Sequence, residues 1–350
     1  MQIGIHAPLY PADADLVRDL GVTATKFGAD VGGEPGEEQI PDIDRHFDLA
    51  DELGLSCVVD LRTSQQYMFE RAMETQIALT QAGDPRLLRS TPETTEDERK
   101  AIAEGNHALV HLEAYKPLLA NVTATVARYA NRCSEWEFWG ESNCPYVAGP
   151  AFRNTYTTYS GILRLVCAAI KAGNPAARVW TGGNGMDLEL GCYRGLLNDG
   201  AGQAFDVCNL HPYFTTVRSR EVADYRLETG LTELREDLNT RGLGQPYAAT
   251  EWGYPTHSVT ASAPEIETYL FSNVCVNGYR QLGWSEARLW YEADLAAFER
   301  FGFETVIVHS LRDTPKGNPF WGDLCGLVDV EGRRKSAYEV VQRWAWKGRD

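Results

Sequence analysis

Two glutamates stand out because each lies at the end of a short apolar run with a tryptophan beside it. Glu141 comes two residues after Trp139, and Glu251 directly precedes Trp252. Two carboxyl groups can share one reaction, since one donates a proton to a leaving oxygen while the other attacks carbon. Glycoside hydrolysis uses such a pair on either side of the bond that breaks. Glu141 and Glu251 are therefore candidates for a catalytic pair.

The two carboxyl groups need different surroundings for this division of labour. An apolar setting or a neighbouring negative charge raises the pKa of a proton donor, whereas hydrogen-bond donors keep a nucleophile ionised. Trp139 and Trp252 can supply apolar walls, and Tyr213 can supply a donor. We expect these three side chains to lie beside the glutamates.

Short apolar runs alternate along the chain with longer segments of helical periodicity, which favours βαβ units and a parallel sheet. The expected strands are residues 3–6, 24–27, 56–60, 135–139, 178–181, 206–210, 247–250 and 305–309. The expected helices are residues 13–20, 42–53, 108–131, 152–172, 188–198, 220–241, 264–282 with 287–301, and 335–347. Eight such units without a visible linker predict a single (β/α)8 TIM barrel over residues 1–350. A doubly wound open sheet is the alternative architecture.

A barrel of this kind would bring the two glutamates together. Reactive side chains follow the C-terminal ends of the strands, because the strand-to-helix loops build the site there. Glu141 and Glu251 follow the fourth and seventh expected strands. The segment 62–106, between the third strand and its helix, is far longer than an ordinary loop. We expect this excursion to wall a substrate cleft.

The segment 136–143, Trp-Glu-Phe-Trp-Gly-Glu-Ser-Asn, resembles the Trp-x-x-Trp-Asn-Glu-Pro-Asn motif of clan A glycoside hydrolases, especially the β-xylosidase and α-L-iduronidase family. The resemblance continues through residues 206–213, 250–253 and 326–338, so it spans most of the chain. It implies a retaining glycosidase with a carbohydrate substrate. Within it, Glu141 matches the acid/base, Glu251 the nucleophile, and His211 and Tyr213 the active-site residues after the sixth strand.

The chain departs from the clan's pattern at Gly140, at Ser142, which stands in place of the motif's proline, and at Lys26. The clan's asparagine before the acid/base, which contacts the sugar 2-hydroxyl, is Gly140 here. We therefore expect either a substrate that differs at C2 or a replacement donor such as Asn143 or Asn184. Lys26 stands where the clan often has an arginine, and a lysine makes a point contact instead of a bidentate one. We expect Lys26 to orient Glu251 or an acidic sugar, with a solvated lysine as the alternative.

Further residues are expected at the same mouth. His6 ends the first strand, and His211 follows the sixth. Trp252 and Trp321 offer flat faces on which sugar rings can stack. We expect no metal site, because no third ligand with convincing spacing accompanies His6 and His211. No other cofactor is expected.

The composition excludes several classes of partner. A formal net charge of −16 and a pI of about 4.9 repel nucleic-acid backbones and anionic lipid surfaces. No apolar run approaches the ~18 residues of a membrane span, and the N-terminus lacks the pattern of a secretory signal. We expect a cytoplasmic protein without nucleic-acid or membrane partners and with dispersed, buried and unpaired cysteines.

Two other classes of function fit parts of the sequence. Gly140 and the missing signal are consistent with a non-catalytic carbohydrate-binding or structural barrel, but the two intact glutamates argue against it. A sugar-phosphate isomerase or lyase requires a phosphate-binding loop after the seventh or eighth strand, whereas the glycine-rich segment 182–185 follows the fifth. The glycosidase interpretation is favoured.

Overall fold

Parallel strands and helices alternate along the chain. The computed structural model describes residues 1–6, 9–32, 40–64, 67–68, 70–71, 74, 112–141, 156–183, 190–198, 200–213, 220–256, 282–314 and 324–347. The strands are β1 Gln2–His6, β2 Ala24–Asp30, β3 Ser56–Arg62, β4 Glu135–Phe138, β5 Arg178–Thr181, β6 Cys208–Leu210, β7 Tyr247–Trp252 and β8 Phe303–Val308. The helices are α1 Ala14–Leu20, α2 Ile40–Leu53, α5 Leu112–Arg128, α7 Tyr156–Gly173, α8 Leu190–Asn198, α9 Arg220–Thr240, α11 Trp284–Arg300 and α12 Ser336–Trp346. Short 3-10 helices occupy Pro11–Asp13 and Ala201–Gln203.

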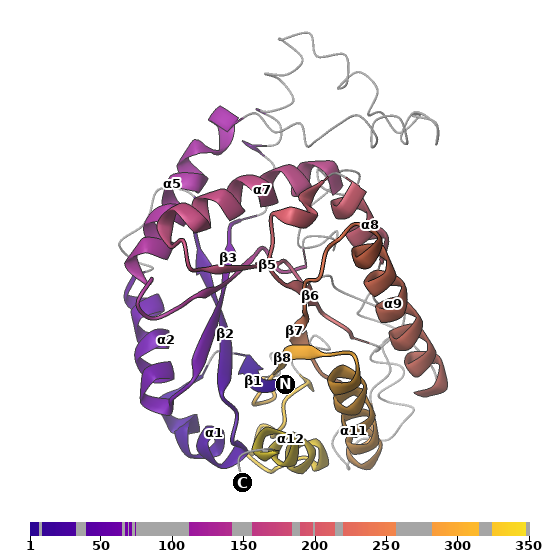
Figure 1. Ribbon diagram of the computed structural model, residues 1–350. Coiled ribbons are helices and arrows are strands. Elements are labelled where there is room, and N and C mark those ends of the chain that lie inside the picture. The colour runs from indigo at the N-terminus through magenta and orange to yellow at the C-terminus, as the bar shows by residue number, and fades with distance from the viewer. Residues whose placement is uncertain are drawn as a thin grey trace.

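The strands form a nearly closed barrel surrounded by helices (Figure 1). Their order is β5-β4-β3-β2-β1-β8-β7-β6, and each neighbouring pair is parallel. The two end strands meet through a parallel bridge between Trp180 and Val207. The N–H of Asp206 also donates to the carbonyl of Val179 at 2.7 Å. The predicted (β/α)8 fold is confirmed, and the open-sheet alternative is wrong.

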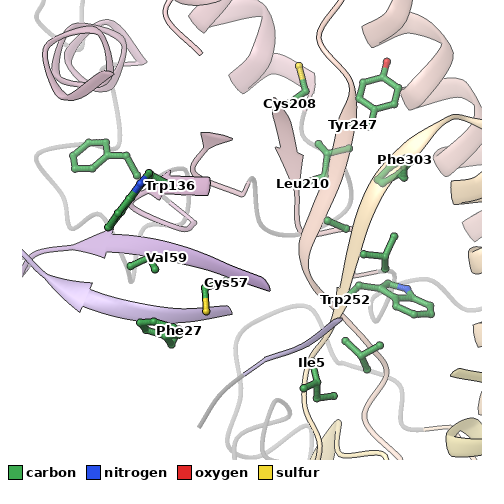
Figure 2. Close-up of a cluster of buried hydrophobic side chains, with 14 of the residues drawn as sticks. Ile5, Phe27, Cys57, Val59, Trp136, Cys208, Leu210, Tyr247, Trp252 and Phe303 are labelled. Atoms are coloured by element: carbon green, nitrogen blue, oxygen red, sulfur yellow. The ribbon is translucent and has the colours of Figure 1, made fainter. Parts of the chain in front are cut away.

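The side chains of the strands fill two separate cores because successive residues point to opposite faces. A small cluster inside the barrel consists of Val58, Trp180, Val207, Ala248 and Ile307. The larger cluster packs between strands and helices, and Figure 2 shows part of it. The described cysteines at positions 57, 133, 167, 208 and 325 are buried and free, as expected.

The last helix completes the outer layer. Helix α12 packs against α1 and α11. The hydroxyl of Tyr338 donates to the carbonyl of Leu16 at 2.9 Å, and the indole of Trp346 donates to the carbonyl of Asp19 at 3.2 Å. Among the described helices, none combines the length and apolar character needed to cross a membrane.

Several strands extend further than the sequence predicts. Strand β3 continues to Arg62, and β7 continues to Trp252. Glu251 therefore belongs to the end of a strand instead of the loop after it. Most of the expected excursion at 62–106, and nearly all of the expected helix at 264–282, lie outside the described residues.

Candidate active site

A backbone turn after β4 delivers Glu141 to the barrel mouth. Trp139 and Glu141 have φ angles of 54° and 60°, a left-handed backbone conformation that residues other than glycine rarely adopt. The N–H of Glu141 donates to the carbonyl of Gly183 at 2.8 Å, which ties the turn to the end of β5. Residues in this conformation cost about 1–3 kcal/mol each and concentrate at functional sites.

A β-bulge in β7 delivers Glu251. Ala249 pairs with Val306 and Trp252 pairs with Val308, so three steps on β7 oppose two on β8. The extra residue breaks the alternation of faces, and bulges commonly re-aim a side chain beside an active site. Thr250 and Glu251 consequently both face the interior, while Trp252 points outward.

The two glutamates meet around a histidine. One carboxylate oxygen of Glu141, one ring nitrogen of His211 and one carboxylate oxygen of Glu251 all lie within 4.8 Å of one another. His211 Nδ1 is 3.1 Å from Glu141 Oε1 and 3.7 Å from Glu251 Oε2. Each glutamate side chain is 14% exposed, whereas His211 is fully buried. Each glutamate side chain therefore keeps a small exposed fraction beside the fully buried histidine.

A buried lysine, Lys26, contacts the carboxylate of Glu251. Lys26 Nζ lies 3.2 Å from Glu251 Oε1 and 3.0 Å from Glu137 Oε2, and its side chain is completely inaccessible. It also donates to the hydroxyl of Thr250 at 3.3 Å. Lys26 is thus no solvated lysine, and its contacts agree with the expected orientation of Glu251.

The charges around Glu251 fix its protonation state. Burial alone would raise the pKa of Glu251, but its neighbours, above all the ammonium group of Lys26, outweigh burial and hold the pKa well below its ordinary value. Burial lowers the pKa of Lys26, yet its carboxylate neighbours, above all Glu137, raise it overall. Both groups are therefore charged at neutral pH, and Glu251 is available as an anion.

Other expected residues also surround Glu251. His6 Nε2 lies 3.4 Å from Glu251 Oε1, and the hydroxyl of Tyr213 donates to Glu251 Oε2 at 3.3 Å. The ring centroids of His309 and His6 lie 5.0 Å apart, and the two rings are tilted relative to each other. Burial lowers the pKa of His309 to about 4. The ring of His309 is therefore neutral near pH 7.

Asp60 and Arg62, which the sequence interpretation missed, join the same cluster. Arg62 Nε donates to Asp60 Oδ2 at 2.5 Å, and Arg62 Nη2 is 3.7 Å from Glu251 Oε1. Asp60 is fully buried, whereas the Arg62 side chain is 43% exposed. The alternation of a strand places both on one face. An aspartate and an arginine at the end of an otherwise apolar strand were the signal that could have identified them.

Gly140 leaves room for this cluster. A Cβ atom at this position would lie 2.9 Å from Asp60 Oδ2 and 3.2 Å from Glu137 Oε1, which is too close without movement. The N–H of Gly140 donates to Asp60 Oδ1 at 3.2 Å. The asparagine of the clan A motif could stand here only if the carboxylates of Asp60 and Glu137 moved away from its Cβ atom.

The tryptophans differ from expectation. Trp252 is fully buried in the outer core (Figure 2). Its indole nitrogen donates to Asp294 on helix α11 at 2.9 Å. This placement corrects the expectation that Trp252 lines the site. Trp139 is also almost entirely buried. Asn143, Asn184 and Trp321 lie outside the described residues.

The spacing of Glu141, His211 and Glu251 also suits a metal ion. The sequence offered His6 and His211 without a third ligand, whereas the structure brings two carboxylates to His211. Lys26 and Arg62 already place positive charge beside Glu251, and this charge opposes a further cation. The absence of a functional metal stays a prediction.

Comparisons with known proteins relate the chain to glycosidase structures. No family model and no curated protein matches the sequence. A family 39 glycoside hydrolase from Bacteroides cellulosilyticus WH2 has a TM-score of 0.63 at 15% identity, covering 98% of this chain and 63% of that one. A glucosidase from Croceicoccus marinus has a TM-score of 0.62 at 14% identity, covering 98% of this chain and 65% of that one.

A third similar structure is an exo-β-1,4-mannosidase from Opitutaceae bacterium strain TAV5, with a TM-score of 0.57 at 14% identity. The alignment covers 99% of this chain and 59% of the mannosidase. The chain thus spans between 59% and 65% of the length of these three structures. At such identities the likeness establishes a shared barrel fold.

Proposed function

We propose that this protein is a retaining glycoside hydrolase in which Glu141 is the acid/base and Glu251 the nucleophile. The separation of the two carboxyl groups carries this proposal. Retaining enzymes hold the pair about 5–5.5 Å apart, whereas inverting enzymes need roughly 6.5–9.5 Å to admit a water molecule. Oxygens of Glu141 and Glu251 within 4.8 Å of each other fit the retaining geometry.

The first step uses the charge difference between the two groups. Glu141 transfers its proton to the glycosidic oxygen as the bond from that oxygen to C1 breaks, and Glu251 forms a bond to C1. The contacts with Lys26 and Tyr213 support this role, since they hold Glu251 as an oriented anion. Glu141 contacts Nδ1 of His211, whereas Thr250 contacts Nε2 of the same ring.

The second step reverses the roles. Glu141, now a carboxylate, takes a proton from water while the water oxygen bonds to C1 and the bond from C1 to Glu251 breaks. Each displacement inverts C1, so the product keeps the configuration of the substrate. No cofactor takes part in either step.

The substrate is a carbohydrate, and we expect it to carry a neutral hydroxyl at C2. A sugar bonded through C1 to Glu251 has its C2 substituent beside the same carboxylate, where Arg62 Nη2 lies 3.7 Å from Oε1. A guanidinium has five N–H groups, and Asp60 uses the one on Nε. The carboxylates of Asp60, Glu137 and Glu251 disfavour an anionic substituent. Arg62 is thereby the proposed hydrogen-bond donor to the 2-hydroxyl, in place of the clan's asparagine at position 140.

Similarity to glycosidase structures over nearly the whole chain supports this function. We place the protein among clan A glycoside hydrolases on this basis, together with the strand-four and strand-seven motifs. A specific closeness to the β-xylosidase and α-L-iduronidase family remains part of the proposal.

The stereochemistry of the first-formed product tests the proposal. A panel of aryl glycosides in both anomeric configurations is incubated with the protein, and proton NMR follows the anomer that appears before mutarotation. Retention of the substrate configuration is expected. Initial release of the opposite anomer would exclude the double displacement. No turnover on any member of a broad panel would contradict the proposal that the protein is a glycosidase.

A further inference from the structure

Thr250, the residue before the proposed nucleophile, lies where three other buried side chains converge. Its Oγ1 is 2.7 Å from Asn209 Nδ2, 3.3 Å from Lys26 Nζ and 3.0 Å from His211 Nε2. All four residues are fully buried. Buried polar groups satisfy their hydrogen bonds within the protein, so the direction of each bond can be worked out from its partners.

The orientation of the Asn209 amide follows from a backbone group. The N–H of Thr250, which can only donate, lies 3.0 Å from Asn209 Oδ1. This contact fixes Oδ1 as the acceptor and turns the NH2 group of Asn209 towards the Thr250 hydroxyl. Asn209 therefore donates to Thr250 Oγ1.

The remaining contacts settle the role of the hydroxyl. The ammonium group of Lys26 can only donate, so it fills the second lone pair of Thr250 Oγ1. With both lone pairs engaged, the hydroxyl proton must be given away, and His211 Nε2 at 3.0 Å is the acceptor. Glu137 Oε1 lies 3.9 Å from the same nitrogen, which is too far for a hydrogen bond.

We propose that Thr250 is a positioning residue that holds neutral His211 in the tautomer with its proton on Nδ1. In this tautomer Nδ1–H donates to Glu141 Oε1 at 3.1 Å, so an acid proton on Glu141 resides on Oε2. Thr250 thus presents the acid oxygen of Glu141 in one defined orientation. This last consequence rests on the proposed function, whereas the tautomer itself does not.

The network also joins the two catalytic carboxyl groups. Lys26 donates to Glu251 Oε1 and to Thr250 Oγ1, and Thr250 donates onward to His211. A single buried hydroxyl therefore lies between the cation that holds the nucleophile and the histidine that orients the acid/base. Its removal should affect the chemical step more than substrate binding.

Nitrogen-15 NMR of the histidine side chains in the full-length protein tests the assignment. The His211 signals are identified by their loss in His211→Asn. We expect Nε2 to show the shift of an unprotonated nitrogen in the wild type and in Thr250→Ser, which keeps the hydroxyl. In Thr250→Val, which keeps the shape and loses the hydroxyl, we expect the Nε2–H tautomer to gain population.

Kinetics provide a second readout of the same variants. We expect Thr250→Val to lower kcat about 10- to 100-fold with little change in KM, and Thr250→Ser to restore most of it. A proton on Nε2 in the wild type, an unchanged tautomer in Thr250→Val, or equal losses in both variants would overturn the role of Thr250. If the wild type hydrolyses no glycoside, the proposed function fails, and the NMR result still decides the tautomer.

Discussion

Lys26 Nζ and Glu251 Oε1 lie 3.2 Å apart although 225 positions separate the two residues in the chain. Strands β2 and β7 carry them, and the barrel brings both side chains to one interior position. Lys26 has no contact with solvent, and its charge is compensated by the carboxylates of Glu137, Glu251 and Asp60. The lysine is therefore both a structural counter-ion and the main cation that keeps Glu251, the proposed nucleophile, ionised.

Lys26→Met should destabilise the protein and move its pH profile. Loss of the lysine leaves buried carboxylates uncompensated, which costs about 3–5 kcal/mol of unfolding free energy in urea titrations. The pKa of Glu251 should rise, because the cation that depresses it is gone. Protonation of the nucleophile then begins at a higher pH, and the acidic limb of kcat/KM shifts upward. Lys116→Met, at an exposed lysine on α5, is the matched control and should change neither quantity.

Arg62→Met should reduce the preference for substrates with a 2-hydroxyl. A hydrogen bond from a charged donor is worth about 1.5–3 kcal/mol, so kcat/KM for the 2-hydroxy glycoside should fall about 10- to 100-fold. The rate on the matching 2-deoxy glycoside should stay nearly constant. Equal losses on both substrates would show that Arg62 only supports Asp60. Arg45→Met, at an exposed arginine paired with Asp42, serves as the control.

Trp252→Phe should affect stability without changing sugar specificity. The indole nitrogen donates to buried Asp294, and its removal leaves that carboxylate with fewer donors. The unfolding free energy should fall by about 1–3 kcal/mol, while relative kcat/KM values across a glycoside panel stay the same. A changed ranking of the sugars would place Trp252 in the substrate site after all. Trp344→Phe, which removes a more exposed contact to Glu292, should cost less.

His309 should make the protein sensitive to acid. Burial lowers its pKa from 6.5 to about 4, so the folded protein binds this proton less readily than the unfolded chain. The corresponding stability is fully present above pH 6.5 and is lost as the pH falls towards 4. We expect a loss of about 1–3 kcal/mol over this window in urea titrations at a series of pH values. His309→Asn cannot titrate there, and an unchanged slope in this variant would contradict the assignment.

The alternation of apolar runs and helical segments was sufficient to predict the barrel, because eight βα units leave few other topologies. It also placed Glu141 and Glu251 at one mouth, since both follow strands of a parallel barrel. The bulge in β7 was not predictable from that pattern. It turns Thr250 and Glu251 inward together and Trp252 outward, whereas the sequence pattern ended the strand at residue 250 and left Trp252 in the loop beside the substrate.

The buried charges were the second feature that local patterns could not reveal. Glu137 and Asp60 lie within apolar strands, and their compensation depends on Lys26 from another strand and, for Asp60, also on Arg62 at the end of its own strand. Interpreted one segment at a time, each charge looks unfavourable in a core. Their favourable pairing arises only once β2, β3, β4 and β7 are closed into one barrel.

The most direct test of the proposed mechanism is chemical rescue of Glu251→Ala with azide on an aryl glycoside that has an activated leaving group. We expect the variant to lose turnover and azide to restore it, with a glycosyl azide of inverted configuration as the product, because the small anion replaces the missing carboxylate. Glu137→Gln, which alters a neighbouring buried carboxylate, should gain nothing from azide. Near-normal turnover by Glu251→Ala without azide would contradict the assignment of Glu251 as the nucleophile.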